Sequence, residues 1–451
     1  MKVLYAILLI LLYPIAAAIV SLYTYDIRIT VIFSSLTYLM NLIITTMLLF
    51  QPDHIGMFYI DFVTKIFLLI INGIFLAMII YSSDYIKHID DPYLHPRYFF
   101  MLSNLFAVTL LFSVVINSTG LLWVGIGAST ATSALLVVLE EKSSAFEATW
   151  RYIIIVSAGL AISLISIALV YHITGTEALN VVPYSLNGSN RILAQIALVL
   201  ALIGFGTKFG LFPISTWLPD VHGEAPAPVS ALFSAILLPV ALYGFMRIYG
   251  ILYPVSNGFS TTIIIYAGIF SALLSSMMFL AQIKYKRLIA YSSMENMSIA
   301  LIGIALGYYG LIASLIIISA HSFAKSSAFF SAGNIKIETD ESVIEKASEI
   351  GIPSTVTKSF ALATMSVTGT PPFGIFFGEF LILYLLVEKS YFIPVFMLII
   401  VMAISFLSML YHSVNMMHST KKTEKITLFM EYLPICLLVI SIVPAILWVR
   451  L

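Results

Sequence analysis

The chain has 451 residues, of which 61% are hydrophobic and only 10% are charged, and its mean hydropathy is +1.04. A net charge of zero gives no indication of nucleic-acid binding, and apolar runs long enough to cross a bilayer recur along the whole chain. We therefore expect an all-α polytopic membrane protein, a single membrane domain over residues 1–451, instead of the two or three soluble domains that length alone suggests. The one cysteine, Cys436, cannot form an intrachain disulfide or hold an iron–sulfur cluster, so we expect no redox cofactor and no metal in this chain.

Fourteen apolar stretches are predicted to cross the membrane as helices, because each can span about 30 Å of hydrocarbon at about 1.5 Å per residue. The predicted spans are residues 3–23, 28–50, 62–82, 98–117, 119–139, 152–173, 192–220, 229–250, 259–283, 288–309, 311–332, 360–386, 391–414 and 426–449. The longest polar stretch, residues 334–357, is too short for a catalytic domain.

Basic residues divide unevenly between the two sets of alternating loops. Of the 22 lysines and arginines, fourteen fall on one side and five on the other, and Lys65, Lys208 and Lys325 lie inside spans. Loops rich in Lys and Arg face the cytoplasm. We therefore expect a multi-pass protein of the cell (plasma) membrane with both termini on the non-cytoplasmic side.

Glycine and proline interrupt two of the predicted helices. The seventh reads GTKFGLF at residues 206–212, and the twelfth reads GTPPFGIF at residues 369–376. Such breaks free backbone groups that lipid cannot satisfy, so they line protein or water. The two helices are five apart and run in opposite directions, which is typical of inverted repeats. We predict two inverted five-helix repeats, at residues 98–250 and 259–414, with broken helices 7 and 12.

Lys208 is the leading candidate for ion transport. A charge at the centre of a membrane helix costs about 2.5–3.5 kcal/mol on insertion scales, and such residues mark ion paths. The alternative is a lysine whose amine snorkels to an interface. The flanking glycines and the helix break favour an interior position.

Glu379, His321 and Lys325 are the next candidates for a proton path. Glu379 follows the second break, and a carboxylate in apolar surroundings is a suitable proton holder; alternatively it is a structural partner for a lysine. His321 and Lys325 lie four residues apart, which puts them on one helix face. Two basic groups this close oppose each other's protonation and can exchange protons, or they form a polar stripe that joins helices.

The remaining candidates are weaker. Glu295 in the tenth helix is expected to be intramembrane and can simply be hydrogen-bonded, whereas His222 and His412 are expected to be solvated near the cytoplasmic face. Lys65, near the outer face, is expected to snorkel. The sequence shows no nucleotide-binding loop and no nucleophile–base pair in a soluble domain, which disfavours an enzyme that acts alone.

Four segments carry a resemblance to one family. They are residues 205–231 with Lys208 and the run WLPDVHGEAPAPVSA, residues 286–295 with the run KRLIAYSSME, residues 321–333 and residues 369–383. They resemble the antiporter-like membrane subunits shared by respiratory complex I, energy-converting [NiFe] hydrogenases of the hydrogenase-4 type and multisubunit Na⁺/H⁺ antiporters. Their Glu-Ala-Pro and Ser-Ser-x-Glu sequences are most similar to those of the hydrogenase-4 branch.

The resemblance implies a fourteen-helix fold with a polar axis along the membrane midplane. Protons would move along that axis, driven by an attached redox module. By this resemblance Lys208 is the seventh-helix lysine, His321 and Lys325 belong to the central axis, and Glu379 is the terminal group of the twelfth helix.

Two positions depart from the family pattern. The fifth helix of relatives usually carries a glutamate that pairs with the seventh-helix lysine, but Val124 or Gly127 occupies that place here, and the acids Glu140 and Glu141 lie only at the end of the helix. Ser234 stands near the eighth-helix basic residue of many relatives. We therefore expect the seventh-helix lysine to be uncharged unless an acid from elsewhere approaches it.

We predict a proton-translocating membrane subunit of a multisubunit oxidoreductase, hydrogenase-type or complex I-like, that couples electron transfer to ion movement. The expected partners are other membrane subunits, the lipid bilayer and protons or Na⁺. Two alternatives stay open: a subunit of a multisubunit cation/proton antiporter without a redox module, and a structural spacer that does not conduct.

Overall fold

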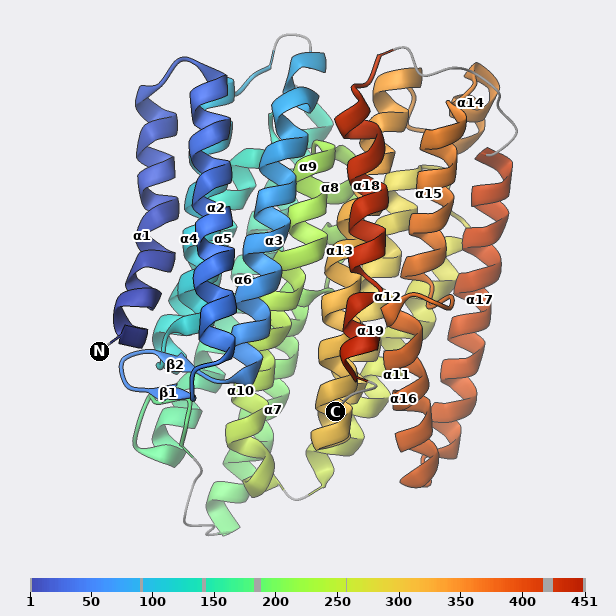
Figure 1. Ribbon diagram of the computed structural model, residues 1–451. Coiled ribbons are helices and arrows are strands. Elements are labelled where there is room, and N and C mark those ends of the chain that lie inside the picture. Colours follow the sequence, from blue (N-terminus) through green and yellow to red (C-terminus); the bar gives the residue numbers. More distant parts are fainter. Residues whose placement is uncertain are drawn as a thin grey trace. The chain divides into compact units, whose positions relative to one another are not determined.

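The computed structural model describes residues 2–89, 92–139, 143–181, 188–256, 258–416 and 425–448, and these residues are almost entirely helical (Figure 1). The long helices are α1 (Lys2–Tyr23), α2 (Ile27–Leu49), α3 (Phe62–Tyr85), α4 (Pro96–Val115), α5 (Thr119–Val137), α6 (Ser143–Thr174), α7 (Gly188–Phe209), α10 (Leu238–Ser256), α11 (Phe259–Phe279), α12 (Tyr285–Ala305), α13 (Tyr308–Thr339) and α17 (Phe392–Met416). The shorter ones are α8 (Trp217–Glu224), α9 (Ala227–Leu232), α14 (Ile344–Ile350), α15 (Ser354–Val367), α16 (Gly374–Glu388), α18 (Leu428–Ile440) and α19 (Val443–Trp448). A 3₁₀ turn (Ile86–His88), a π-helical turn (Phe233–Leu237) and a hairpin of β1 (His54–Ile55) and β2 (Tyr59–Ile60) complete the described elements.

The predicted polytopic all-α fold is confirmed. Thirteen helices among the described residues are long and apolar enough to cross a membrane. The remaining predicted span, 360–386, is divided into α15 and α16 with residues 368–373 between them, so neither half is long enough by itself. The predicted seventh span is likewise interrupted, because α7 ends at Phe209 and α8 begins at Trp217.

Residue contacts divide the chain into two compact units. Unit 1 comprises residues 1–83, 91–209 and 236–263, and unit 2 comprises residues 84–90, 210–235 and 264–451. The chain passes from one unit to the other at Gly210, inside the first break, where a φ of +104° favours glycine. The two predicted inverted repeats stay a prediction.

Small residues in unit 1 bring α6 and α7 close together. A Cβ added at Gly204 would lie 2.5 Å from the Ser163 backbone nitrogen, and one added at Gly159 would lie 2.5 Å from Thr207 Cβ. Contacts this short exclude any larger side chain, so the two helices approach each other at backbone distance. This packing fixes the last turn of α7, which carries Lys208.

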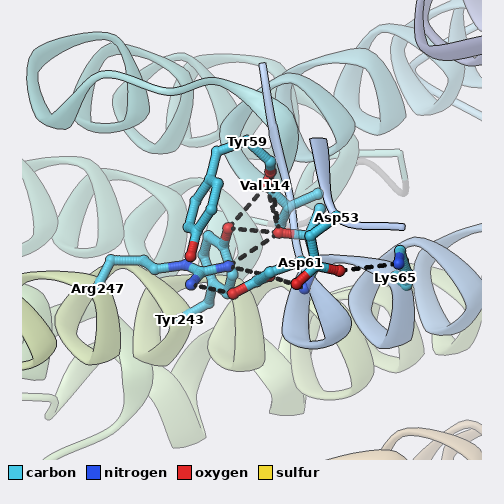
Figure 2. A network of polar contacts seen from close by, with 8 residues as sticks. Asp53, Tyr59, Asp61, Lys65, Val114, Tyr243 and Arg247 are labelled. Atoms are coloured by element: carbon cyan, nitrogen blue, oxygen red, sulfur yellow. Dashed lines mark hydrogen bonds and ion pairs between the residues drawn. The ribbon is translucent and has the colours of Figure 1, made fainter. Parts of the chain in front are cut away.

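A polar network at one end of unit 1 joins α3 to α10 (Figure 2). Asp61, just before α3, accepts two hydrogen bonds from the Arg247 guanidinium, at 2.6 and 2.7 Å. That guanidinium lies 4.9 Å from the Tyr59 ring centroid and 4.7 Å from that of Tyr243, and it also donates to Thr64 at 2.9 Å. Burial alone would raise the pKa of Asp61. The hydrogen bonds from Arg247 and Thr64, together with the charge of Arg247, lower this pKa below its usual value.

The prediction that Lys65 extends its amine to solvent at the interface is wrong. Its side chain is 7% exposed, and Nζ donates to the Gln51 carbonyl at 2.8 Å and to Asp53 Oδ1 at 3.0 Å (Figure 2). The loop before the hairpin folds over the amine and supplies the acceptors that the sequence pattern assigned to solvent.

Unit 2 is built around α13, which packs against α12, α15, α16 and α18. The break between α15 and α16 turns at Gly369, whose φ of +65° is a left-handed value. α17 lies against α15 and α16 at the right of Figure 1, and its apolar outer side exposes Phe396, Ile399 and Leu407. Its inner side carries the buried polar residues Ser405, Ser408 and His412.

Candidate functional site

The Lys208 site lies in unit 1, where the last turn of α7 meets α5. Lys208 is fully buried, and its Nζ donates hydrogen bonds to the Ile126 carbonyl (2.5 Å), Ser129 Oγ (2.8 Å) and Thr130 Oγ1 (2.7 Å). The Ser129 hydroxyl donates to the Ile126 carbonyl at 2.7 Å, so towards the lysine it acts as an acceptor. Three acceptors match the three N–H donors of an ammonium group. Neutral oxygens therefore satisfy every donor of a protonated Lys208.

No ion pair to Lys208 is present in the part of the chain that the structure describes. Glu140 and Glu141, the acids considered from the sequence, lie outside the described residues. At Gly127, where relatives can carry the acid, an added Cβ would meet only Leu160 Cδ1, at 3.9 Å. The fifth helix therefore has room for a larger side chain there but supplies hydroxyl and carbonyl oxygens instead of charge.

The second site lies in unit 2, where α13 packs against α12. Lys325 and His321 are fully buried, and both turn towards α12. Lys325 Nζ donates to the Ile289 carbonyl at 2.8 Å and to the Ser292 hydroxyl. As in unit 1, a buried lysine is held by a carbonyl and a hydroxyl of the neighbouring helix.

Asn296 determines which ring nitrogen of His321 carries a proton. Its Nδ2 donates to the Val367 carbonyl at 3.0 Å and lies 3.1 Å from His321 Nδ1. Because a carbonyl oxygen accepts only, this amide orientation presents an N–H to Nδ1, which must act as the acceptor. The proton of the neutral ring is then on Nε2, which interacts with the Ser234 backbone but makes no well-formed hydrogen bond to a described group.

Two buried carboxylates belong to the same unit. Glu295 of α12 is 2% exposed; its Oε1 accepts from the Ser405 hydroxyl of α17, and its Oε2 has no partner among the described residues. Glu379 of α16 is 3% exposed and packs directly on Gly369, where an added Cβ would lie 1.9 Å from Oε2. Glycine at the break thus leaves the space that this carboxylate fills.

His222 is buried, not solvated as predicted from its position in the sequence. It is fully inaccessible in α8, with its ring centroid 6.1 Å from that of Phe233 and 5.2 Å from that of Phe329. Neither ring nitrogen bonds to a described residue. His412 of α17 is also buried, at 8% exposure.

Five of the buried titratable side chains of unit 2 interact electrostatically and are named here the unit 2 cluster. Its members are His222, Glu295, His321, Lys325 and Glu379, with Lys325 acting on Glu295, His321 and His222, and Glu295 acting on Glu379. Four of the five have a buried polar atom without a partner in the described chain. Buried polar atoms are normally hydrogen-bonded, so these four side chains are unusual among buried groups.

Sequence reasoning named the charged members of both sites and the fifth-helix hydroxyls of Ser129 and Thr130, but not the neutral residues that hold the side chains of unit 2. Ser292 lies inside the run at residues 286–295 and Asn296 directly follows it, yet their bonds to Lys325 and His321 depend on how α12 and α13 pack. Ser405 was missed altogether. The signal that could have identified it is a polar pattern in an apolar helix: Ser405, Ser408 and His412, at spacings of three and four residues.

Comparisons with known proteins identify the family of the chain. Residues 116–408 match the family described as "NADH:quinone oxidoreductase/Mrp antiporter, TM". The chain belongs to this family. It is 33% identical over 360 residues to the "Hydrogenase-4 component F homolog" of Methylacidiphilum infernorum (isolate V4), a match that covers 74% of each chain.

Two solved structures share the fold. The membrane-bound sulfane sulfur reductase, an archaeal respiratory membrane complex, contains a chain with a TM-score of 0.86 and 21% identity, covering 98% of this chain and 94% of that one. The Mrp complex from Dietzia sp. DQ12-45-1b contains one with a TM-score of 0.84 and 14% identity, with the same coverage. The predicted family is thus confirmed: the protein is an antiporter-like, multi-pass membrane subunit of the complex I and hydrogenase type, and its relatives are parts of multisubunit membrane complexes.

Proposed function

We propose that the chain translocates protons across the cell membrane within a hydrogenase-type or complex I-like oxidoreductase. It would work beside other membrane subunits, with both termini on the non-cytoplasmic side and without a redox centre of its own. The observation that carries the proposal is the unit 2 cluster, in which acids and bases are buried and electrostatically coupled. Buried, paired titratable groups within membrane helices mark proton relays.

The arrangement can pass charge by coupled titration. A proton on Lys325 is stabilised by the nearby Glu295 carboxylate, and Glu295 in turn affects Glu379. When titratable groups interact, gain or loss of a proton at one shifts the proton occupancy of the others. A charge change imposed at one end by a redox partner can therefore move protons along the cluster. In unit 1, Lys208 would serve as a further carrier.

The similarity to a hydrogenase-4 component favours the redox-linked function over the antiporter without a redox module. To test it, the assembled complex is reconstituted in proteoliposomes, and protons moved per electron are measured for the wild type, Lys325→Ala and Glu379→Gln. We expect both variants to lose most translocation while electron transfer continues. Full translocation in both would favour the spacer, and proton movement driven by a Na⁺ gradient without an electron donor would favour the antiporter.

A further inference from the structure

Polar side chains on α17 lead away from Glu295 towards the end of that helix. Ser405, Ser408 and His412 repeat at spacings of three and four residues, which places them on one helix face. All three are buried, at 1%, 2% and 8% exposure. Ser405 donates a hydrogen bond to Glu295 Oε1, so this face is the one that meets the acid.

His412 lies where α11 and α17 both end. Its Nε2 is 3.3 Å from the carbonyl of Phe279, the last residue of α11. α14 contacts both segments here, because the Ile344 N–H donates at 3.0 Å to the Ile283 carbonyl, just after α11, and the Ser348 hydroxyl donates at 2.7 Å to the Asn415 carbonyl, in the last turn of α17. The two helices therefore run towards the same end, and α17 continues about one turn beyond His412.

One turn before this contact, each of the two helices carries a serine. Ser408 precedes His412 by four residues, and Ser275 precedes Phe279 by four, which puts both about 6 Å deeper at about 1.5 Å per residue. Both side chains are buried, and neither hydroxyl has a partner among the residues described. Two unbonded hydroxyls thus lie at one depth on neighbouring helices.

α12 brings Glu295 to the same depth. Ser271, one turn deeper than Ser275 on α11, is 2.7 Å from Ser298 of α12. A short loop joins α11 to α12, so the two helices run in opposite directions. The residue three positions before Ser298 therefore lies about one turn closer to the end of α11, at the depth of Ser275. That residue is Glu295, whose Oε2 lacks a partner in the described chain.

We propose that Ser275 Oγ, Ser408 Oγ and Glu295 Oε2 bind an ordered water, and that this water and His412 form a proton-uptake branch into the unit 2 cluster. A buried water typically makes about three hydrogen bonds, which is the number of unpartnered oxygens here. The proposal rests on the proposed function, and it adds a lateral route through α17 to it.

The branch moves one proton without any other chemistry. His412 Nε2 donates to the Phe279 carbonyl, which leaves Nδ1 to accept a proton from bulk water at the end of the helix. The proton then passes by way of the Ser408 hydroxyl and the ordered water to the Glu295 carboxylate, and His412 returns to the neutral form. Glu295 becomes a protonated acid that hands its proton on to the cluster.

The test uses the assembled complex in proteoliposomes and four variants: His412→Ala, Ser408→Ala, Ser413→Ala and Lys325→Ala. Ser413 is the matched control, because it is a buried serine of the same helix whose hydroxyl bonds to Thr364 at 2.7 Å, away from Glu295. We expect His412→Ala and Ser408→Ala to slow translocation at least about tenfold, since positioned groups contribute about 10²–10⁴-fold to proton transfer. Ser413→Ala should remain near the wild type.

Chemical rescue separates proton transfer from a structural effect. Imidazole added on the side where α17 ends should restore flux to His412→Ala, whereas pyrazole, of the same shape but far less basic, should not. Rescue by both compounds, or normal flux in His412→Ala and Ser408→Ala while Lys325→Ala is inactive, would overturn the branch but leave the proposed function. Normal flux in Lys325→Ala as well would overturn both. A map of the complex that shows the three oxygens without water between them would also contradict the branch.

Discussion

Lys208→Met removes the buried amine of unit 1 and keeps an unbranched side chain of nearly the same length. Its hydrogen bonds with three oxygens are lost, at about 0.5–1.5 kcal/mol each for a neutral amine. The cost of burying a polar group, about 1–3 kcal/mol, is removed with them. The Ile126 carbonyl still accepts from Ser129, so this acceptor keeps a partner. We expect the free energy of unfolding to change by less than about 2 kcal/mol.

If Lys208 carries protons, the rate of proton translocation should fall strongly while the free energy of unfolding changes little. Co-purification of subunits and thermal unfolding report on assembly, and proton uptake by proteoliposomes reports on transport. Lys65→Met is the matched control, because Lys65 is also a buried lysine of unit 1 but bonds to the half-exposed Asp53 and to the Gln51 carbonyl. The reasoning is refuted if Lys208→Met falls apart during purification or transports protons at the wild-type rate.

Three further outcomes follow from other parts of the chain. Asp61→Asn should lower stability by about 3 kcal/mol, because Arg247 loses its buried partner. Because the pKa of Asp61 is lowered in the folded state, its contribution to stability is present above its unfolded pKa and is lost as the pH falls below about 4. The thermal unfolding temperature of the wild type should therefore fall more than that of the variant below this pH. Gly369→Ala should displace Glu379 and reduce proton flux, whereas equal flux would show that the carboxylate's position is unimportant. Gly127→Glu should place an acid beside the α7 lysine and change the protons moved per electron; no change, with the pair seen in a structure, would remove unit 1 from the path.

The sequence predicted the broken helices because their signal is local. Glycine and proline at residues 206–213 and 369–374 interrupt apolar runs, and the structure ends α7 and begins α16 there. Charged residues inside apolar spans are also visible without a structure, which is why Lys208, Lys325 and Glu379 could be named in advance.

What could not be predicted depends on contacts between distant segments. His222 was expected near the cytoplasmic face and assigned to solvent, but it packs against the aromatic rings of Phe233 and Phe329. No spacing rule links Lys208 to its acceptors about 80 residues earlier, and only the resemblance to relatives pointed to the fifth helix that supplies them. Partners of neutral side chains such as Ser405 are likewise set by packing.

The break after α7 also has an electrical consequence. The helix stops one residue beyond Lys208, so the last carbonyl groups of α7, which have no intrahelical donors, gather next to the lysine. They amount to about half a negative elementary charge at this helix end, and a cation in the last turn gains about 0.3–1 kcal/mol from it. Unlike a carboxylate, these backbone dipoles cannot take up a proton. Among the described residues, Lys208 therefore faces fixed backbone dipoles, where a lysine paired with glutamate would titrate as a coupled pair.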